Sequence, residues 1–195
     1  MRIIGLTGSI GMGKTTTAGF FRAAGIPVHD ADAAVHRLYS GPAAAAVEAA
    51  FPGTAPDGVV DRERLAEAVL GDQLALKRLE AIIHPLVRER EKAFLQTAAE
   101  AGAPMAVLEI PLLFETGAEK RCDAVVVVTA EPEVQRQRVL KRPGMTEARL
   151  QALLANQMPD AEKRRRAHFL VLTDNDLDSA KRQVTAIIRA LTASG

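Results

Sequence analysis

Short runs of aliphatic residues recur along the chain and predict the strands of a single sheet. Each run is continuously apolar instead of alternating with polar residues, which is typical of strands buried on both faces of a parallel sheet. Helical patterns lie between or after the runs, so strand and helix alternate as in a doubly wound α/β fold with five parallel strands. The runs are Ile3 to Thr7, Pro27 to His29, Ala106 to Ile110, Ala124 to Thr129 and Phe169 to Leu172.

Helices are predicted on both sides of this pattern. One covers Thr15 to Ala24, directly after the first strand, and the last one lies near Ser179 to Leu191. In the last helix, apolar residues recur at spacings of three and four between Val184 and Leu191, which makes one packing face.

Two helical stretches interrupt the alternation and are long enough to form insertions. Residues 34–102 predict a helical lobe, in which Pro85 should end or kink a helix. Residues 134–166 predict a second insertion, where residues 142–144 (Arg-Pro-Gly) break one helix and Thr146 can cap the next. We therefore expect one domain of 195 residues, in which both segments are inserted into a common core.

The charge is distributed unevenly along the chain. The net charge is only +1, which argues against a surface made as a whole for nucleic acid. Residues 134–166, however, hold nine basic and three acidic side chains and therefore carry +6. Such a segment indicates either an anionic partner or a solvated helical face.

The remaining composition points to a protein of a reducing compartment. Cys122 is the only cysteine and cannot form an intrachain disulfide, so we expect it to be a buried structural thiol. The first residues lack the apolar stretch of a signal peptide, and no run approaches the roughly 18 apolar residues of a membrane span. We expect a cytoplasmic location and no membrane partner.

One glycine-rich string carries the most specific chemical signal. Residues 8–15 read Gly-Ser-Ile-Gly-Met-Gly-Lys-Thr, and they join the first predicted strand to the first helix, as a phosphate-binding loop requires. Its backbone N–H groups can point into one concavity at the helix N-terminus; a turn without a ligand is the alternative. Lys14 should reach the terminal phosphates of ATP, and the Thr15 hydroxyl should bind Mg²⁺. The expected nucleotide contacts are Gly8, Gly11, Met12, Gly13, Lys14, Thr15 and Thr16.

Further signals favour a small-molecule kinase over a GTPase. The Asp-x-x-Gly and Asn-Lys-x-Asp strings of GTPases do not occur. Asp30 and Asp32 follow the second strand, where one carboxylate can accept the proton of an attacking hydroxyl; an Asx turn or helix cap is the alternative. Arg138 and Arg142 lie four apart on a predicted helix, either as a lid over the transferred phosphoryl group or as solvated arginines.

Several strings resemble, in order, the motifs of the dephospho-CoA kinase family. They include the phosphate-binding loop, residues 28–32 (Val-His-Asp-Ala-Asp) and residues 82–87 (Ile-Ile-His-Pro-Leu-Val). Residues 108–117 (Leu-Glu-Ile-Pro-Leu-Leu-Phe-Glu-Thr-Gly) and 157–159 (Gln-Met-Pro) follow, so the resemblance spans Ile3 to about Arg166. The chain departs from the family pattern at Ser9, Thr15 and Glu109, where glycine, serine and aspartate are usual.

The resemblance implies ATP-dependent phosphorylation of the ribose 3′-hydroxyl of dephospho-CoA, the final step of coenzyme A biosynthesis. It also implies a CoA-binding lobe at 34–102 and a lid at 134–166. Lys14 would bind phosphate, Asp32 would be the base, and Arg138 or Arg142 would be the lid arginine. The residues implied at the acceptor site are Asp30, Asp32, His84 and Leu113.

Two other functions stay open at this point. One is a kinase for another small acceptor, such as a nucleoside monophosphate or a sugar, and the other is an ATP-switched module whose basic segment binds RNA. Aromatic residues make up only 4% of the chain, without tryptophan, so few side chains could stack on bases. We therefore expect a small-molecule substrate, no nucleic-acid partner, and a monomer or a weak homo-oligomer. The contacts to adenine are left unassigned.

Overall fold

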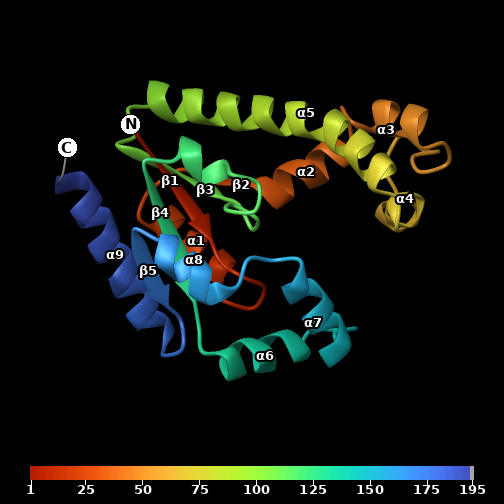
Figure 1. Ribbon diagram of the computed structural model, residues 1–195. Coiled ribbons are helices and arrows are strands. Elements are labelled where there is room, and N and C mark those ends of the chain that lie inside the picture. The colour runs from red at the N-terminus through yellow and green to blue at the C-terminus, as the bar shows by residue number, and fades with distance from the viewer. Residues whose placement is uncertain (194–195) are drawn as a thin grey trace. The chain divides into compact units, whose positions relative to one another are not determined.

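The computed structural model describes residues 1–193 and divides the chain into two compact units (Figure 1). The first unit, here called the sheet unit, comprises residues 1–29 together with the chain from Ala98 onward. The second, here called the helical unit, comprises Asp30–Thr97. Each unit has a hydrophobic cluster of its own.

The sheet unit is built on five strands in the order β2-β3-β1-β4-β5. Strand β1 pairs in parallel with β3 and with β4, and β4 pairs in parallel with β5. The predicted α/β fold with a five-stranded parallel sheet is therefore confirmed, and each apolar run lies within one residue of a strand. The strands are β1 (Arg2–Thr7), β2 (Val28–Asp30), β3 (Met105–Glu109), β4 (Ala124–Thr129) and β5 (Phe169–Leu172).

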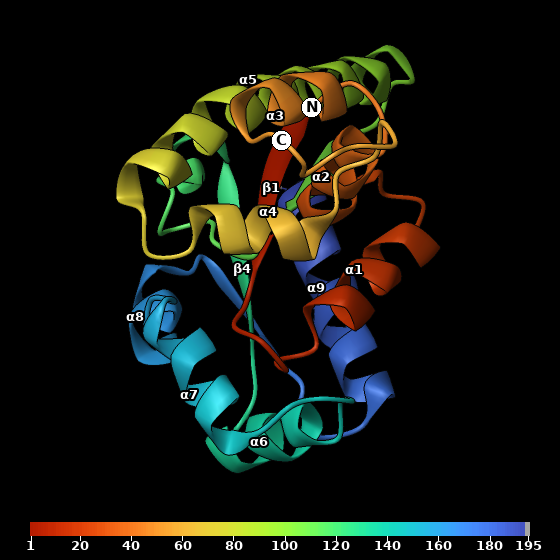
Figure 2. The ribbon, with the colours of Figure 1, turned by 90° about the vertical axis from the view of Figure 1, so that its right-hand side faces the viewer.

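Helices cover both faces of this sheet. In Figure 2, α1 and α9 lie on one side of β1 and β4, and α8 lies on the other side. The predicted helices after the first strand and near the C-terminal end are confirmed. The helical segments of the unit are α1 (Lys14–Ala23), η1 (Ala118–Arg121), α6 (Pro132–Leu140), α7 (Glu147–Ala155), α8 (Asp160–Arg166) and α9 (Leu177–Ala193).

The two faces of β1 pack against different neighbours because its side chains alternate. Ile4 and Leu6 are fully buried in the cluster that also holds Phe21 of α1. A Cβ at Gly5, between them, would lie 3.0 Å from both Leu113 and the Cys122 sulfur, so this glycine allows the chain after β3 to pack closely. Leu113 is thus a core side chain with no exposed surface. Cys122 is only partly buried, whereas the sequence predicted a buried thiol.

The helical unit consists of four helices around a second cluster. An aspartate side chain accepts backbone N–H groups at the start of three of them: Asp30 at α2, Asp61 at α4 and Asp72 at α5. The cluster includes Leu38, Val47 and Leu65, all buried. The helices are α2 (Ala31–Tyr39), α3 (Ala44–Ala50), α4 (Arg62–Val69) and α5 (Gln73–Glu100).

Helix α5 decides between two predictions for Pro85, because it does not end there. The helix runs for 28 residues with Pro85 inside it, so a kink is the alternative that stays a prediction, and His84 is helical. Proline removes one N–H donor from the helix ladder, but the helix continues for many residues on either side. Despite its length α5 is rich in charged side chains, and within residues 1–193 no helix is both long and apolar enough to cross a membrane.

Substitutions at Leu65, within α4, and at Leu70, directly after it, can test how much the second cluster contributes to stability. Leu65 is 4% exposed and Leu70 is 83% exposed. We expect Leu65→Ala to lower the free energy of unfolding by about 2–5 kcal/mol, because it removes buried methyl groups and leaves a cavity. The matched Leu70→Ala should change it by less than about 0.5 kcal/mol. Denaturant titration of both variants measures the difference, and equal costs would contradict the assignment of this core.

Candidate active site

The connection between β1 and α1 is a tight loop whose backbone geometry depends on glycine. Gly11 and Gly13 have φ angles of 78° and 90°, in the left-handed region that other residues rarely adopt. The Met12 N–H donates to the Ser9 carbonyl at 3.2 Å and closes a turn within the loop. Thr15 and Thr16, just inside α1, are exposed. The glycine string therefore forms a tight turn between β1 and α1, at the place that the sequence predicted.

Strand β4 and helix α6 pack closely against this loop. A Cβ at Gly8 would lie 2.6 Å from the Val128 carbonyl oxygen of β4, and a Cβ at Gly11 would lie 2.5 Å from a Val139 methyl group of α6. Real Cβ atoms are essentially never found this close to other atoms. The lack of a side chain at Gly8 and Gly11 therefore allows the loop backbone to pack against β4 and α6.

Lys14 begins α1 and is held by a buried carboxylate at the end of β3. Its ammonium group donates to Glu109 Oε1 at 3.1 Å, and an Arg22 nitrogen lies 3.5 Å from Glu109 Oε2. Glu109 is only 2% exposed, and its Oε2 accepts no hydrogen bond from residues 1–193. Since a buried carboxylate needs compensating charge, the two cations stabilise it. Glu109 in turn fixes the lysine of the loop.

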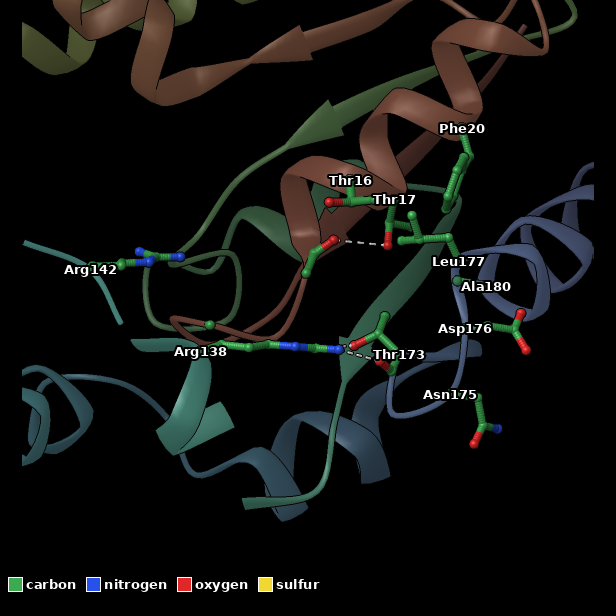
Figure 3. Close-up of a pocket in the computed structure, with 12 residues that line it drawn as sticks. Thr16, Thr17, Phe20, Arg138, Arg142, Thr173, Asn175, Asp176, Leu177 and Ala180 are labelled. Carbon is green, nitrogen blue, oxygen red and sulfur yellow. Dashed lines mark hydrogen bonds between the residues drawn. The ribbon is translucent and has the colours of Figure 1, made fainter. Parts of the chain in front are cut away.

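Thr173 joins the loop to β4 and α6. Its hydroxyl donates to the Met12 carbonyl at 2.8 Å and accepts from Arg138 Nη1 at 2.9 Å, and its N–H donates to Thr129 O at 3.0 Å. Arg138 Nη2 also donates to the Thr173 carbonyl oxygen, and Figure 3 shows the guanidinium extended toward Thr173. Sequence reasoning did not single out Thr173, because its three partners are distant from it along the chain.

A cavity of about 280 Å³ opens beside the loop (Figure 3). Its walls come from five places in the sheet unit: the loop, α1, the end of α6 with the residues just after it, the connection from β5 to α9, and the start of α9. Backbone, hydroxyl, guanidinium and apolar groups all contribute, a mixture typical of a small-molecule site. The lining residues are Gly11, Gly13, Thr16, Thr17, Phe20, Arg138, Arg142, Thr173, Asn175, Asp176, Leu177 and Ala180.

Arg138 and Arg142 both line this cavity, but not in the predicted manner. The sequence placed both on one helix, whereas α6 ends at Leu140 and Arg142 lies beyond it. The cause is local, since Pro143 follows and disfavours helical geometry at the preceding residue. The break at residues 142–144 and the cap are confirmed, because Thr146 accepts the Arg149 N–H at 3.2 Å and begins α7.

Most other basic side chains of residues 134–166 have acidic partners. Arg136 lies 2.8 Å from a Glu147 oxygen, and Arg165 and Arg166 both bind Glu162. The acids of these pairs, Glu147 and Glu162, are already counted in the net charge of +6, so the segment keeps its excess of positive charge. Arg138 and Arg142 remain as the basic side chains of this segment that face the cavity beside the loop.

One ion pair in this region is buried. Lys163 has no exposed surface, and its ammonium group lies 2.9 Å from Glu115 Oε1, which also accepts the Met158 N–H at 2.7 Å. Burial raises the pKa of the Glu115 carboxyl, but these two hydrogen bonds and the charge of Lys163 outweigh that effect and hold the pKa below its ordinary value. The pair attaches α8 to the segment that follows β3.

The acceptor candidates of the helical unit differ in their environments. Asp30 Oδ1 accepts the Ala33 N–H at 2.9 Å, so the alternative of a helix cap is confirmed for this residue. Asp32, in the first turn of α2, is exposed and has no hydrogen-bond partner among residues 1–193. His84 is also exposed, on α5. Asp32 is thus the carboxylate of the Asp-Ala-Asp string that is free to accept a proton.

Together the parallel sheet, the glycine loop and the lysine at its end define the chain as a P-loop kinase by fold. A shikimate kinase from Acinetobacter baumannii shares this fold with a TM-score of 0.52 at 18% identity, over 100% of this chain and 94% of that one. A structure from Thermus thermophilus, TT1252, is much more similar, with a TM-score of 0.86 at 37% identity over 98% of both chains.

The sequence comparisons identify the family. The family model for dephospho-CoA kinase matches residues 2–179. The dephospho-CoA kinase of Mesorhizobium japonicum is 64% identical over 98% of this chain and 97% of its own length, and that of Brucella melitensis is 58% identical over 98% and 96%. The chain therefore belongs to the dephospho-CoA kinase family, as the ordered motifs predicted.

Two glycines with the same backbone angle test the loop. Gly11 and Gly25 both have φ of 78°, but a Cβ at Gly25 would have no atom within 4 Å. Gly11→Ala and Gly25→Ala should both cost about 1–2 kcal/mol of stability through backbone strain. Only Gly11→Ala should abolish binding of ADP, measured by calorimetry, because its methyl group would collide with Val139 and displace the loop. Native ADP affinity in Gly11→Ala would contradict this role of the close packing.

Proposed function

We propose that this chain transfers the γ-phosphate of ATP to the ribose 3′-hydroxyl of dephospho-CoA and releases CoA and ADP. The observation that carries the proposal is a phosphate-binding loop that ends in Lys14, in a chain of the dephospho-CoA kinase family. Both substrates are small and soluble in water, so we expect the reaction to take place in the cytoplasm.

The loop and its surroundings suit a magnesium-bound nucleotide. The left-handed glycines leave space for phosphate against the backbone, and Lys14 supplies a cation at the start of α1. The exposed Thr15 hydroxyl and the orphan oxygen Oε2 of buried Glu109 are oxygen ligands of the kind that Mg²⁺ prefers. When bound, the ion would neutralise charge on the phosphates.

The cavity beside the loop is the proposed site of the nucleoside. It offers an apolar wall from Phe20, Leu177 and Ala180, suited to the face of a base, and polar groups at Asn175 and Asp176. Arg138 and Arg142 supply positive charge at the same cavity, where they would bind phosphate oxygens. We therefore assign the adenine contacts, which the sequence left open, to α1, to the connection from β5 to α9 and to the start of α9.

The helical unit supplies the proposed acceptor groups. Asp32 is free to take the proton from the attacking hydroxyl, while Asp30 holds the start of α2 on which Asp32 lies. His84 remains a proposed contact to the acceptor. Leu113 is better explained as a support of the loop after β3, because its side chain is wholly buried.

A small cavity in the helical unit suits the diphosphate of this acceptor. It measures about 90 Å³ and is lined by Ala34, Arg37, Leu38 and Arg90. Neither guanidinium has an ion-pair or hydrogen-bond partner among the residues that the structure describes. Two uncompensated arginines at one cavity favour a phosphate ligand, because a guanidinium can donate two parallel hydrogen bonds to it.

The acceptor is tested directly by coupled ADP release with MgATP and a panel of hydroxyl compounds. We expect turnover with dephospho-CoA that far exceeds turnover with nucleoside monophosphates, shikimate or simple sugars. The proposal fails if dephospho-CoA gives no turnover while another acceptor does.

Substitution of Asp32, the proposed base, should lower the catalytic rate while the fold persists. We expect Asp32→Asn to lower kcat by about 10²-fold or more, because an amide cannot accept the proton of the hydroxyl. Asp57→Asn, at an exposed turn of the same unit, is the control and should keep the native rate. Near-native kcat in Asp32→Asn, from initial rates at saturating substrates, would remove Asp32 from this role.

Substitution at the small cavity should affect one substrate only. We expect Arg90→Ala to raise KM for dephospho-CoA by about tenfold or more through loss of charge-assisted hydrogen bonds, while KM for ATP stays unchanged. Adenosine, tested as a slow acceptor without phosphates, should react equally with both proteins. Lys77→Ala, exposed on the same helix, is the control. Equal loss with adenosine and dephospho-CoA would refute a phosphate contact.

A further inference from the structure

Two glutamines hold the Ile10 backbone of the phosphate-binding loop from both sides. Gln135 of α6 donates from Nε2 to the Ile10 carbonyl oxygen at 2.7 Å, and Gln157, between α7 and α8, accepts the Ile10 N–H at its Oε1 at 3.3 Å. Gln135 is 7% exposed. Both lie more than a hundred residues from Ile10 along the chain, so the contacts depend on the tertiary fold.

The contact from Gln135 determines the direction of the next amide in the loop. The Ile10 carbonyl and the Gly11 N–H belong to one planar peptide unit, and the peptide bonds of the described residues are trans. In a trans unit these groups point in opposite directions. Because the Ile10 carbonyl points at Gln135 on α6, the Gly11 N–H points away from α6. The Gly11 N–H is the first of the backbone amides from Gly11 to Lys14.

The contact from Gln157 determines the preceding peptide unit in the same way. Because the Ile10 N–H is directed at Gln157, the Ser9 carbonyl of that unit points to the opposite side. There it accepts the Met12 N–H at 3.2 Å, the bond that closes the turn. The two glutamines therefore fix φ and ψ of Ile10 together, at the point where the loop departs from β1.

Gln157 is itself held in place by its neighbours. The next residue, Met158, donates its N–H to Glu115, which forms the buried ion pair with Lys163 of α8. Gln157 thus lies between a rigid ion pair and the loop. The proposed chemistry does not use the Gln-Met-Pro string. These contacts give the string a structural role beside the loop.

We propose that Gln135 and Gln157 are positioning residues, which orient the amides of the loop toward the phosphates of the nucleotide. This inference rests on the proposed function only in taking the loop as the nucleotide site, and it does not depend on the identity of the acceptor. A glutamine that only filled space would contribute to stability and would not distinguish between ligands with and without phosphates.

Binding of ADP and of adenosine to the whole protein tests the proposal. We expect Gln157→Leu and Gln135→Leu each to weaken ADP binding by about tenfold, the value of one hydrogen bond, and to leave adenosine affinity within about twofold. Calorimetry with Mg²⁺ present measures ADP, and ligand-observed NMR measures the weaker adenosine. Equal weakening of both ligands, or no weakening of ADP, would overturn the proposal.

Two exposed glutamines, one on α6 and one on α7, serve as controls. Gln137 on α6 and Gln151 on α7 are exposed and donate to Glu133 and Glu147. Leucine at either position should leave the ratio of ADP to adenosine affinity at the native value. Should Gln135→Leu unfold in a thermal melt, Gln135→Met gives the same comparison, because it keeps the length of the side chain, removes the donor and adds no charge.

The double variant distinguishes a shared task from two separate ones. Since both side chains act on one residue, loss of either should release the turn, and the second substitution should add less than the first. We expect Gln135→Leu with Gln157→Leu to weaken ADP binding by clearly less than the product of the two single effects. Full additivity would show that the glutamines do not act together on Ile10.

The native protein separates failure of this inference from failure of the proposed function. If the native protein binds no ADP, both the proposed function and this inference fail. If the native protein binds ADP and the variants bind it equally well, only this inference fails.

Discussion

At the end of β1 the backbone of the glycine loop packs directly against β4 and α6. The rest of the structure depends on this close packing. Any side chain at Gly8 would meet the backbone of β4, and one at Gly11 would meet α6. Because the loop itself has few side chains to form contacts, other elements must hold it from outside. Thr173, Gln135 and Gln157 do so with hydrogen bonds to its backbone.

This arrangement explains why segments remote from the loop have such specific polar residues. The basic segment of residues 134–166 was first of interest for its charge, and three of its arginines form ion pairs with acids of the same segment. Its less conspicuous members, two uncharged glutamines and a buried lysine, make the contacts that tie the segment to the loop and to the chain after β3.

The sequence predicted the parts of the fold that depend on local pattern. Continuous apolar runs located the five strands within one residue, since burial on both faces excludes polar side chains. Pro85 does not end its helix, because a long helix outweighs one missing donor, whereas Pro143 acts locally and ends α6 before Arg142. The loop and its lysine were recognisable from spacing, whereas Thr173 and Gln135 were not, because their partners are brought to them only by the tertiary fold.

The ion pair between Lys14 and Glu109 affects how a nucleotide arrives. The lysine that would receive phosphate has an anion at 3.1 Å, and that anion is buried at the end of β3. The pair keeps the ammonium group at the start of α1, so phosphate would meet a cation whose position is already set. Less conformational freedom of the lysine side chain would then be lost when the nucleotide binds.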